Sequence, residues 1–298
     1  MKLLILGRDG QVGTALTQLL APLGTIVALG RDGADLANPD GLARVVDREQ
    51  PDVIVNAGAY TAVDRAESET ELAQLVNADG PGALARVAAE LDAWLIHYST
   101  DYVFDGEKSE PYVEDDATAP LNVYGATKRA GELAIGEAGS KHLIFRTSWV
   151  HAPGRNNFIA KILSLAQSRD ELKVIDDQIG APTSARLIAE VTARALEQIA
   201  SDRPLPSGIY HLAAAGETSW HGYASYVIGE ARRRGVPLRV PPERVLPVPS
   251  TAFPSPARRP HNSRLSTHKL RTALGIDLPD WQADVLGTLD NLLPETTR

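Results

Sequence analysis

The sequence reads Gly7-Arg8-Asp9-Gly10-Gln11-Val12-Gly13 near its N-terminus, a G-x-x-G-x-x-G pattern. Leu3–Leu6 precedes it as an apolar run typical of a strand, and Gln11–Leu20 follows at helical spacing. Glycines at such a turn let the backbone approach a pyrophosphate closely, and the start of the helix supplies N–H donors. An ordinary glycine-rich turn is the alternative, but the strand–turn–helix order favours a dinucleotide site.

Short apolar runs alternate with helical patterns through the first half of the chain. The predicted strands are Leu3–Leu6, Thr25–Leu29, Val53–Val55, Trp94–Tyr98 and His142–Arg146, and two of the longer predicted helices are Ala78–Leu91 and Tyr124–Ala138. Val53–Val55 is apolar at every position, which suits a strand covered on both faces. The pattern predicts an α/β fold with a Rossmann-like doubly wound parallel sheet.

The second half is less regular and predicts a smaller α/β substrate-binding domain. Helical patterns cover Phe158–Ser168, Ala185–Ala200, Tyr223–Arg234 and Trp281–Leu293, with a short strand at Ile209–Leu212. Eight prolines between Pro237 and Pro260 predict an ordered, extended loop region. We expect residues 1–150 to form the dinucleotide-binding domain, with 183–205 returning to it. Residues 151–182 and 206–298 are then expected to form the substrate-binding domain.

Composition excludes several classes of protein. The 298 residues carry a net charge of 30 − 38 = −8, which argues against a broad nucleic-acid-binding surface. The absence of cysteine excludes disulfides, thiolate metal sites and cysteine nucleophiles. No stretch approaches the ~18 apolar residues that a membrane span needs, and the first apolar run is too short for a signal peptide. We expect a cytoplasmic protein without membrane or nucleic-acid partners. His97, His142 and His211 lie in or near predicted strands without metal-ligand spacing, so we expect them to be structural and expect no metal site.

The end of the second predicted strand reads Leu29-Gly30-Arg31-Asp32, where dinucleotide folds contact the adenosine ribose. An acidic residue there favours NAD, whereas an arginine accommodates the extra phosphate of NADP. Arg31 therefore favours NADPH, although the adjacent Asp32 leaves NADH possible and a solvated surface charge is the alternative. Other residues expected along the cofactor are Asp35, Leu36, Ala57, Gly58 and Ala59.

Tyr124 and Lys128 lie four residues apart in a predicted helix and therefore share one face. A free tyrosine has a pKa of ~10, and a nearby ammonium favours the phenolate, so Lys128 could tune Tyr124. A surface pair is the alternative. Thr100 follows the fourth predicted strand, at the edge where parallel sheets bind ligands, and could hydrogen-bond a substrate carbonyl. Local turn capping is the alternative for Thr100.

This order of motifs resembles the extended short-chain dehydrogenase/reductase superfamily. Five blocks are together similar to the dTDP-4-dehydrorhamnose reductase family: Ser99-Thr100-Asp101-Tyr102-Val103-Phe104-Asp105-Gly106, Pro120-Leu121-Asn122-Val123-Tyr124-Gly125, Phe145-Arg146-Thr147-Ser148-Trp149-Val150, Asp177-Gln178-Ile179-Gly180-Ala181-Pro182-Thr183 and Pro256-Ala257-Arg258-Arg259-Pro260. The similarity runs essentially end to end. It implies NAD(P)H-dependent reduction of the 4-keto group of dTDP-4-dehydro-L-rhamnose, the last step of dTDP-L-rhamnose biosynthesis for bacterial surface glycans.

The resemblance also implies roles for individual residues. Tyr124 would protonate the developing alkoxide, Lys128 would tune Tyr124 and hold the nicotinamide ribose, and Thr100 would orient the carbonyl. The remaining implied contacts are Gly10, Gln11 and Val12 on the pyrophosphate, Ala59, Tyr60, Thr61 and Tyr98 along the cofactor, and Asp101 and Trp149 on the nucleotide-sugar. Arg258 and Arg259 could meet the substrate diphosphate, with a loop anchored by salt bridges as the alternative.

One feature departs from the family. Some members dimerise around magnesium held by acidic side chains, but the matching positions here are Ala15, Arg186 and Asn291. None is acidic and Arg186 would repel a cation, so we expect no structural magnesium and a monomer or weak homodimer.

Two other functions remain open. Nucleotide-sugar epimerases and dehydratases share this fold, but a dehydratase usually has an Asp-Glu pair after the catalytic threonine, and this chain has Asp101-Tyr102. A non-catalytic, NADP-binding regulatory subunit is the second alternative. Intact Thr100, Tyr124 and Lys128 argue against that alternative without excluding it.

Overall fold

The computed structural model describes residues 1–154, 157–201 and 205–293. Its centre is a six-stranded parallel sheet with the strand order β10-β5-β4-β3-β1-β2. The strands are β1 (Lys2–Leu6), β2 (Thr25–Leu29), β3 (Val53–Asn56), β4 (Trp94–Thr100), β5 (Lys141–Thr147) and β10 (Gly208–His211). The order reverses between β1 and β3, which is the point where such sheets bind ligands.

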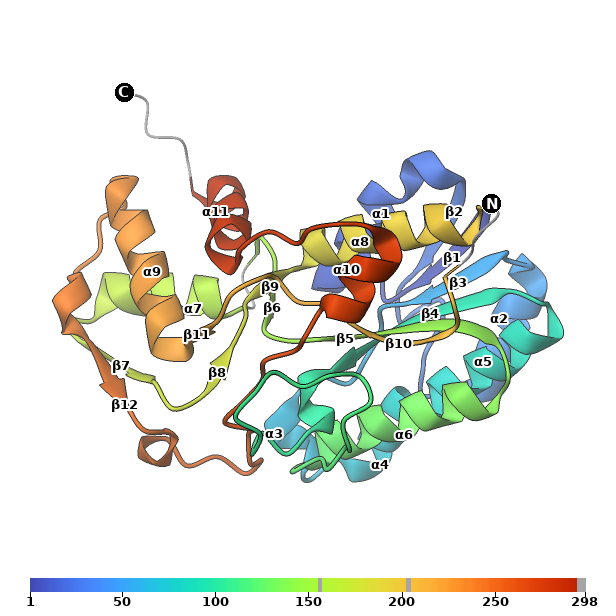
Figure 1. Ribbon diagram of the computed structural model, residues 1–298, viewed down its shortest axis with the longest axis horizontal. Coiled ribbons are helices and arrows are strands. Elements are labelled where there is room, and N and C mark those ends of the chain that lie inside the picture. Colours follow the sequence, from blue (N-terminus) through green and yellow to red (C-terminus); the bar gives the residue numbers. More distant parts are fainter. Residues whose placement is uncertain (155–156, 202–204, 294–298) are drawn as a thin grey trace.

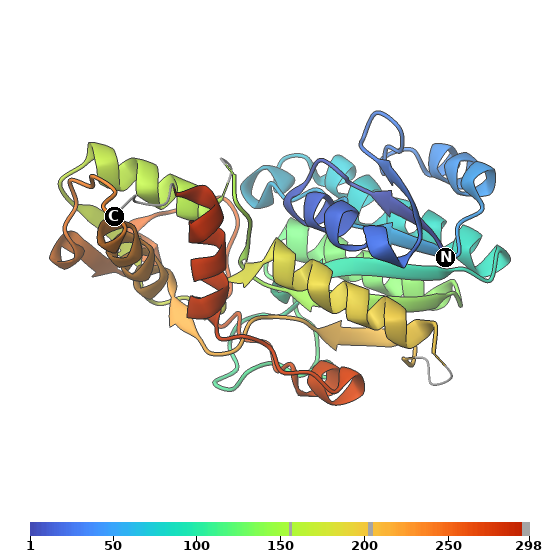
Figure 2. The same cartoon turned by 90° about the horizontal axis from the view of Figure 1, so that it is seen from above.

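Helices cover both faces of this sheet (Figures 1 and 2). One face carries α1 (Gln11–Leu19) and α8 (Ala185–Ile199), which pack against each other. The other carries α2 (Pro39–Glu49), α5 (Gly80–Glu90) and α6 (Val123–Glu137), with the short α3 (Val63–Ala66) and α4 (Thr70–Gln74) beside α6. Alternate residues of β1 enter the two cores, because successive side chains of a strand point to opposite faces.

A smaller lobe is built on α7 (Phe158–Ser168), α9 (Trp220–Arg233) and α11 (Trp281–Leu292). It lies at the left of Figure 1, and a parallel pair of strands, β7 (Leu172–Ile175) and β12 (Val245–Val248), forms its outer side. The short pairs that connect the lobes are β6 (Val150–His151) with β9 (Thr183–Ser184), and β8 (Ile179–Gly180) with β11 (Thr218–Ser219). Short 3₁₀ turns span Ala21–Leu23, Asp101–Val103, Pro242–Arg244 and Ser250–Ala252.

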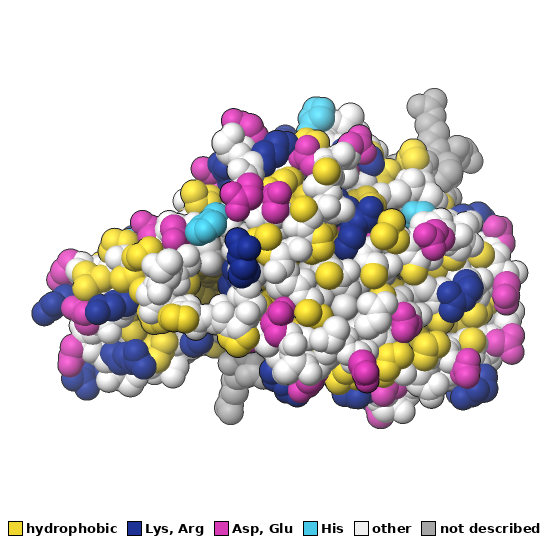
Figure 3. Space-filling model, turned by 90° about the horizontal axis from the view of Figure 1, so that it is seen from below, with side chains coloured by type: hydrophobic (Ala, Val, Ile, Leu, Met, Phe, Trp, Pro, Cys, Tyr) yellow, Lys and Arg dark blue, Asp and Glu magenta, His cyan; other side chains and the backbone are white. Residues whose placement is uncertain are grey.

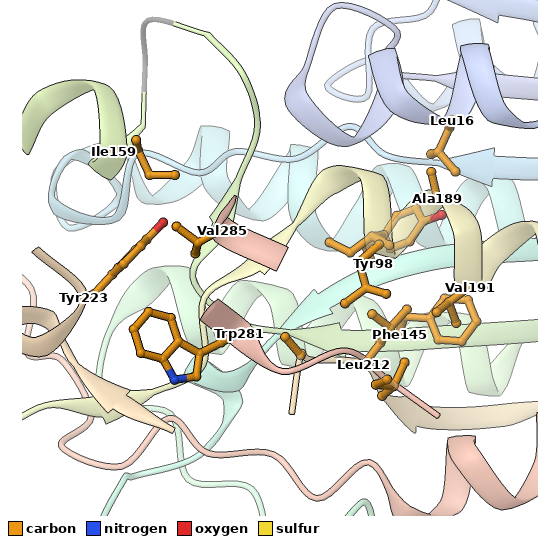
Figure 4. Close-up of a cluster of buried hydrophobic side chains, with 14 of the residues drawn as sticks. Leu16, Tyr98, Phe145, Ile159, Ala189, Val191, Leu212, Tyr223, Trp281 and Val285 are labelled. Carbon is orange, nitrogen blue, oxygen red and sulfur yellow. The ribbon is translucent and has the colours of Figure 1, made fainter. Parts of the chain in front are cut away.

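One apolar core continues from the large lobe into the small one. Figure 4 shows Leu16 and Phe145 at the sheet end of this cluster, and Tyr223 and Trp281 at the other end. All four side chains are buried. The small lobe therefore packs on the sheet domain through a shared core. No helix in the described part of the chain combines the length and apolar character that crossing a membrane requires.

The predicted fold class is confirmed: a doubly wound parallel α/β sheet with a smaller second region. Most predicted elements begin and end within a few residues of the observed ones. The sequence analysis missed β12 inside the proline-rich stretch, its partner β7, and α10 (His268–Leu274). It also missed the short elements β6, β8, β9, β11, α3 and α4. Pro247 is compatible with β12, because that strand pairs on one side only and its other edge needs no N–H donor.

Candidate active site

The glycine turn is packed too closely to accept side chains. Gly7 has a φ of +81°, and a Cβ on it would lie 2.6 Å from the Gly58 nitrogen. A Cβ on Gly13 would lie 2.0 Å from the Gly7 oxygen. Gly10 is the extended N-cap of α1, and Gln11 is exposed beside it, with the half-buried Val12 next. The turn thus offers backbone N–H groups at a helix start, the geometry that suits a pyrophosphate.

Charged side chains gather where β2 ends. Arg31 is 75% exposed and its Nε lies 3.3 Å from Asp35 Oδ2. Arg8, which the sequence analysis did not single out, lies 3.4 Å from Asp32 Oδ2. Leu36 is buried, and a Cβ on Gly58 would lie 2.7 Å from its Cδ1. This end of the site therefore presents two arginines, each beside a carboxylate, and Leu36 is packed close to Gly58.

The segment after β3 is held by a residue that the sequence analysis missed. Asn77 Oδ1 accepts from the Tyr60 N–H at 2.8 Å, and Asn77 Nδ2 donates to the Tyr60 oxygen at 3.1 Å. Asn77 Nδ2 also donates to Thr127 Oγ1 on α6 at 3.2 Å. A π-helical turn over Leu75–Asp79 places this amide, a device common at functional sites. Ala57, Gly58, Ala59 and Tyr60 are half-buried along this segment, and Thr61 is exposed.

Thr100 and Tyr124 meet at the carboxyl edge of the sheet. Thr100 ends β4, and Tyr124 lies in the first turn of α6, whose N-cap Asn122 accepts from the Gly125 N–H at 2.8 Å. Burial raises the pKa of Tyr124 to about 12, although a hydrogen bond with Thr100 lowers it. We expected the charge of Lys128 to favour the phenolate, but burial dominates instead. The phenol therefore stays protonated at neutral pH, as a general acid requires.

Lys128 lies one turn further along α6 and is 1% exposed. Its Nζ donates to the Tyr98 oxygen at 2.6 Å and lies 3.0 Å from His97 Nε2. Burial lowers the pKa of Lys128 to about 8, although the Glu132 carboxylate acts in the opposite direction. The alternative of a surface pair is therefore wrong, because Lys128 is held against β4.

The Tyr98 side chain points away from this group. Its hydroxyl lies 2.8 Å from Thr192 Oγ1 on α8, and its ring centroid is 6.1 Å from that of Phe145 (Figure 4). The phenol of Tyr98 belongs to the core, and its backbone oxygen faces Lys128. Any contact of Tyr98 with a cofactor would have to come from its backbone.

Asp101 follows Thr100 directly and is 3% exposed. Thr100 Oγ1 donates to Asp101 Oδ1 at 3.0 Å, and the Tyr102 N–H donates to Thr100 Oγ1 at 3.2 Å. Thr100 thus does cap a local turn, and it also faces Tyr124. Burial raises the pKa of Asp101 to about 6, although hydrogen bonds from Ser263 and Thr100 lower it.

A cleft of about 1140 Å³ lies between the two lobes, and Tyr102 is one of its lining residues. Figure 3 shows it as a hollow where the narrow lobe meets the larger one, with basic side chains beside it. Its basic and aromatic lining residues include Lys161, Arg169, Lys173, Arg258, Arg259, Tyr102, Phe158, Trp220 and Phe253. A basic, aromatic cleft can hold both the phosphates and the base of a nucleotide.

Arg259 lines the cleft and is also tied into the loop that carries it. Its Nη2 lies 2.8 Å from Asp64 Oδ2, and its Nη1 donates to Ser255 Oγ at 2.6 Å. Asn122 Nδ2 donates to the Arg258 oxygen at 2.7 Å, which attaches this loop to the start of α6. Both interpretations of the arginine pair are therefore compatible with the geometry.

Trp149 adopts a φ of +49°, which is rare for a bulky residue. Its ring stacks on Trp220 at 3.7 Å between centroids, and a Cβ on Gly180 would lie 2.8 Å from it. Trp220 lines the cleft and Trp149 supports it. The sequence analysis missed Trp220, since only the tertiary stacking connects these two residues.

Comparison with known proteins identifies the family. The family model described as the RmlD substrate binding domain matches residues 1–293. The dTDP-4-dehydrorhamnose reductase of Shigella flexneri is 52% identical over 300 residues, covering 99% of both chains. That of Salmonella typhimurium is 49% identical over 301 residues and 100% of both. The chain belongs to the dTDP-4-dehydrorhamnose reductase family.

Solved structures of this family share the whole fold. The crystal structure of the Bacillus anthracis reductase in complex with NADP has a TM-score of 0.88 and 32% identity, covering 97% of this chain and 98% of that one. A UDP-glucose 4-epimerase from Thermus thermophilus, in complex with NAD, has a TM-score of 0.79 and 20% identity over 98% and 99% of the two chains. This second likeness shows the fold alone.

Proposed function

We propose that this chain uses NADPH to reduce the 4-keto group of dTDP-4-dehydro-L-rhamnose to dTDP-L-rhamnose. Membership of the reductase family supports the reaction. The single observation that carries the residue assignment is the meeting of Thr100 with the protonated phenol of the half-buried Tyr124. Lys128 is held one helical turn away. A missing second carboxylate after Asp101 favours reduction over dehydration.

The residues of the glycine turn fit the pyrophosphate of a dinucleotide, because the turn leads into α1 and no side chain caps the first N–H groups of that helix. A bound nicotinamide supplies the hydride. Tyr124 donates its phenolic proton to the C4 oxygen of the sugar. Thr100 favours this release, because its hydroxyl, which donates to Asp101 Oδ1 in this structure, can turn to donate to the phenolate and so lowers the pKa of Tyr124. Lys128 holds the nicotinamide ribose and keeps the surroundings of the phenol polar.

NADPH is the proposed cofactor, with NADH as an alternative substrate of the same site. Arg31 and Arg8 lie beside carboxylates at the end of β2, the place where dinucleotide folds contact the adenosine ribose, and guanidinium groups match phosphate oxygens well, which supports this choice. The Bacillus anthracis relative was crystallised with NADP. The role of Arg31 is tested by measuring the affinities of Arg31→Ala for NADPH and for NADH separately.

The nucleotide-sugar is proposed to occupy the cleft between the lobes. Arg259 meets its diphosphate there, and Asp101 contacts the sugar. Trp149 acts on the substrate through the Trp220 ring that it supports. A monomer or weak homodimer without magnesium is proposed, since Ala15, Arg186 and Asn291 supply no carboxylate for the ion. Light scattering should not change when EDTA is added, whereas a dimer that dissociates in EDTA would contradict this.

The experiment is an NADPH oxidation assay of the purified chain with dTDP-4-dehydro-L-rhamnose. We expect one NADPH consumed per dTDP-L-rhamnose formed, and Tyr124→Phe should lower turnover by about 100-fold or more. Tyr226→Phe is the matched control, because Tyr226 lies on α9 and its hydroxyl donates to the backbone oxygen of Gln282 on α11 at 3.4 Å. Product without net NADPH consumption would indicate an epimerase or dehydratase. NADPH binding without any reduction would indicate a regulatory subunit.

A further inference from the structure

A buried line of polar groups runs from β3 to Lys128 and is not used by the mechanism above. Asn56 is 1% exposed and His97 is 0% exposed, on the adjacent strands β3 and β4. Asn56 Nδ2 lies 3.1 Å from His97 Nδ1, and His97 Nε2 lies 3.0 Å from Lys128 Nζ. Polar groups this deeply buried are costly unless each donor meets an acceptor.

The Gly58 N–H determines the orientation of the Asn56 side-chain amide, and with it the direction of the hydrogen bonds along this line. It donates to Asn56 Oδ1 at 3.2 Å, so the amide nitrogen of Asn56 faces His97. The opposite orientation of the amide would set two N–H donors against each other at Gly58. An amide nitrogen can only donate, so His97 Nδ1 must accept. A neutral imidazole carries one proton, and here that proton must lie on Nε2.

The charge state of His97 is consistent with this tautomer. Burial, together with the nearby Lys128, holds the pKa of His97 well below its ordinary value. The ring is therefore neutral, and its Nε2–H points at the Nζ of Lys128. An ammonium has three donors and no lone pair, whereas a neutral amine can accept this hydrogen bond.

We propose that Asn56 and His97 are positioning residues that hold an imidazole N–H against Lys128 and so disfavour its ammonium form. The charged group that acts on Lys128 is Glu132, on the same helix, and it favours the ammonium. Glu132 is itself paired with the buried Arg146 at 2.8 Å. The inference rests on the proposed function for its purpose: Tyr124 gives up one proton in each turnover and must recover one. A neighbour that readily exchanges a proton near neutral pH can supply it.

Asn56→Asp provides a direct test, because a carboxylate accepts where the amide donated. His97 would then carry its proton on Nδ1, and its Nε2 would accept from the Lys128 ammonium. The chain has seven lysines, so ¹³C-lysine labelling gives a resolvable NMR titration, and Lys128→Met identifies the signal of Lys128. We expect the midpoint of Lys128 to rise by about one pH unit or more, a tenfold change in proton affinity. The fall of kcat on the alkaline side of its pH profile should shift to higher pH together with the Lys128 midpoint.

The negative charge that Asn56→Asp introduces would by itself also raise this midpoint, so the same substitution is made in a His97→Leu background. In that background, Asn56→Asp should raise the Lys128 midpoint by less than half as much as it does with His97 present. The leucine has no ring proton that could move from one nitrogen to the other. An unchanged midpoint in Asn56→Asp, or an equal shift in both backgrounds, would overturn the proposal. If circular dichroism shows that Asn56→Asp does not fold, Asn56→Ser should raise the midpoint by a smaller amount, and no rise would overturn it.

The titration needs no turnover, so it separates this inference from the proposed function. A shifted midpoint in a chain that reduces no keto-sugar would leave the inference standing and remove the proposed function. If the chain reduces the keto-sugar but Asn56→Asp leaves the Lys128 midpoint unchanged, the proposed function stands and the inference is overturned.

Discussion

Replacing Gly13 by alanine should separate cofactor binding from folding at the glycine turn. The new Cβ would lie 2.0 Å from the Gly7 oxygen, 2.6 Å from the Gly7 carbonyl carbon and 2.9 Å from Arg8 Cα. Ordinary contacts begin at 3.4 Å, so the atoms must separate by 3.4 − 2.0 = 1.4 Å. Gly7 cannot retreat, because it is already packed on Gly58 and its N–H donates to the Leu29 oxygen at 2.9 Å. The start of α1 must therefore move.

Overpacking of this kind costs about 1–3 kcal/mol. When the start of α1 is displaced, its first N–H groups no longer point at the pyrophosphate. We therefore expect NADPH binding to weaken by about 10-fold or more, which corresponds to ~1.4 kcal/mol. Isothermal titration calorimetry measures the affinity, and urea unfolding measures the stability. Gly136→Ala is the matched control, since Gly136 is exposed near the end of α6 with nothing within 4 Å of a new Cβ. Wild-type NADPH affinity in Gly13→Ala would refute the assignment of this turn.

Three further substitutions test other parts of the structure. Arg31→Ala should weaken NADPH binding more than NADH binding in the same calorimetric assay. Equal losses of affinity for the two cofactors would show that Arg31 is a solvated surface charge. Asp101→Asn should flatten the pH dependence of stability in urea unfolding: the pKa of Asp101 is raised from 3.8 to about 6, so the folded chain keeps a proton that the unfolded chain releases between these values. Stability should therefore fall with rising pH in that window by up to about 1.4 kcal/mol per pH unit, and an equal slope in the variant would argue against the shift. Glu132→Gln leaves the 1% exposed Arg146 without its carboxylate and should cost about 3–5 kcal/mol of unfolding free energy, with a loss below about 1 kcal/mol as the contrary result.

Local sequence patterns were sufficient for the sheet and for much of the site. Strands buried on both faces read as apolar runs, and Asn38 and Asn122 cap their helices through side-chain oxygens. Thr100, Tyr124 and Lys128 could be predicted because each lies in a short motif whose element type is clear. The helix expected at Ala78–Leu91 begins instead with α4 and a π-turn, since one wider turn changes the register without changing the composition.

Long-range partners could not be predicted in this way. The clamp between Asn77 and Tyr60 spans seventeen positions, and the contact of Asn56 with His97 spans forty-one. A buried histidine on a strand gives no sign in the sequence of which nitrogen carries its proton. The same limit applies to Tyr98, whose side chain direction depends on α8 folding back over the sheet.

Transfer of label from the cofactor tests the central claim most directly. NADPH deuterated at both C4 positions is incubated with dTDP-4-dehydro-L-rhamnose and the purified chain, and the product is analysed by NMR. We expect deuterium at C4 of the sugar, in the L-rhamno configuration, and loss of this product in Tyr124→Phe. A product without deuterium at C4, or one formed equally well by Tyr124→Phe, would contradict the account.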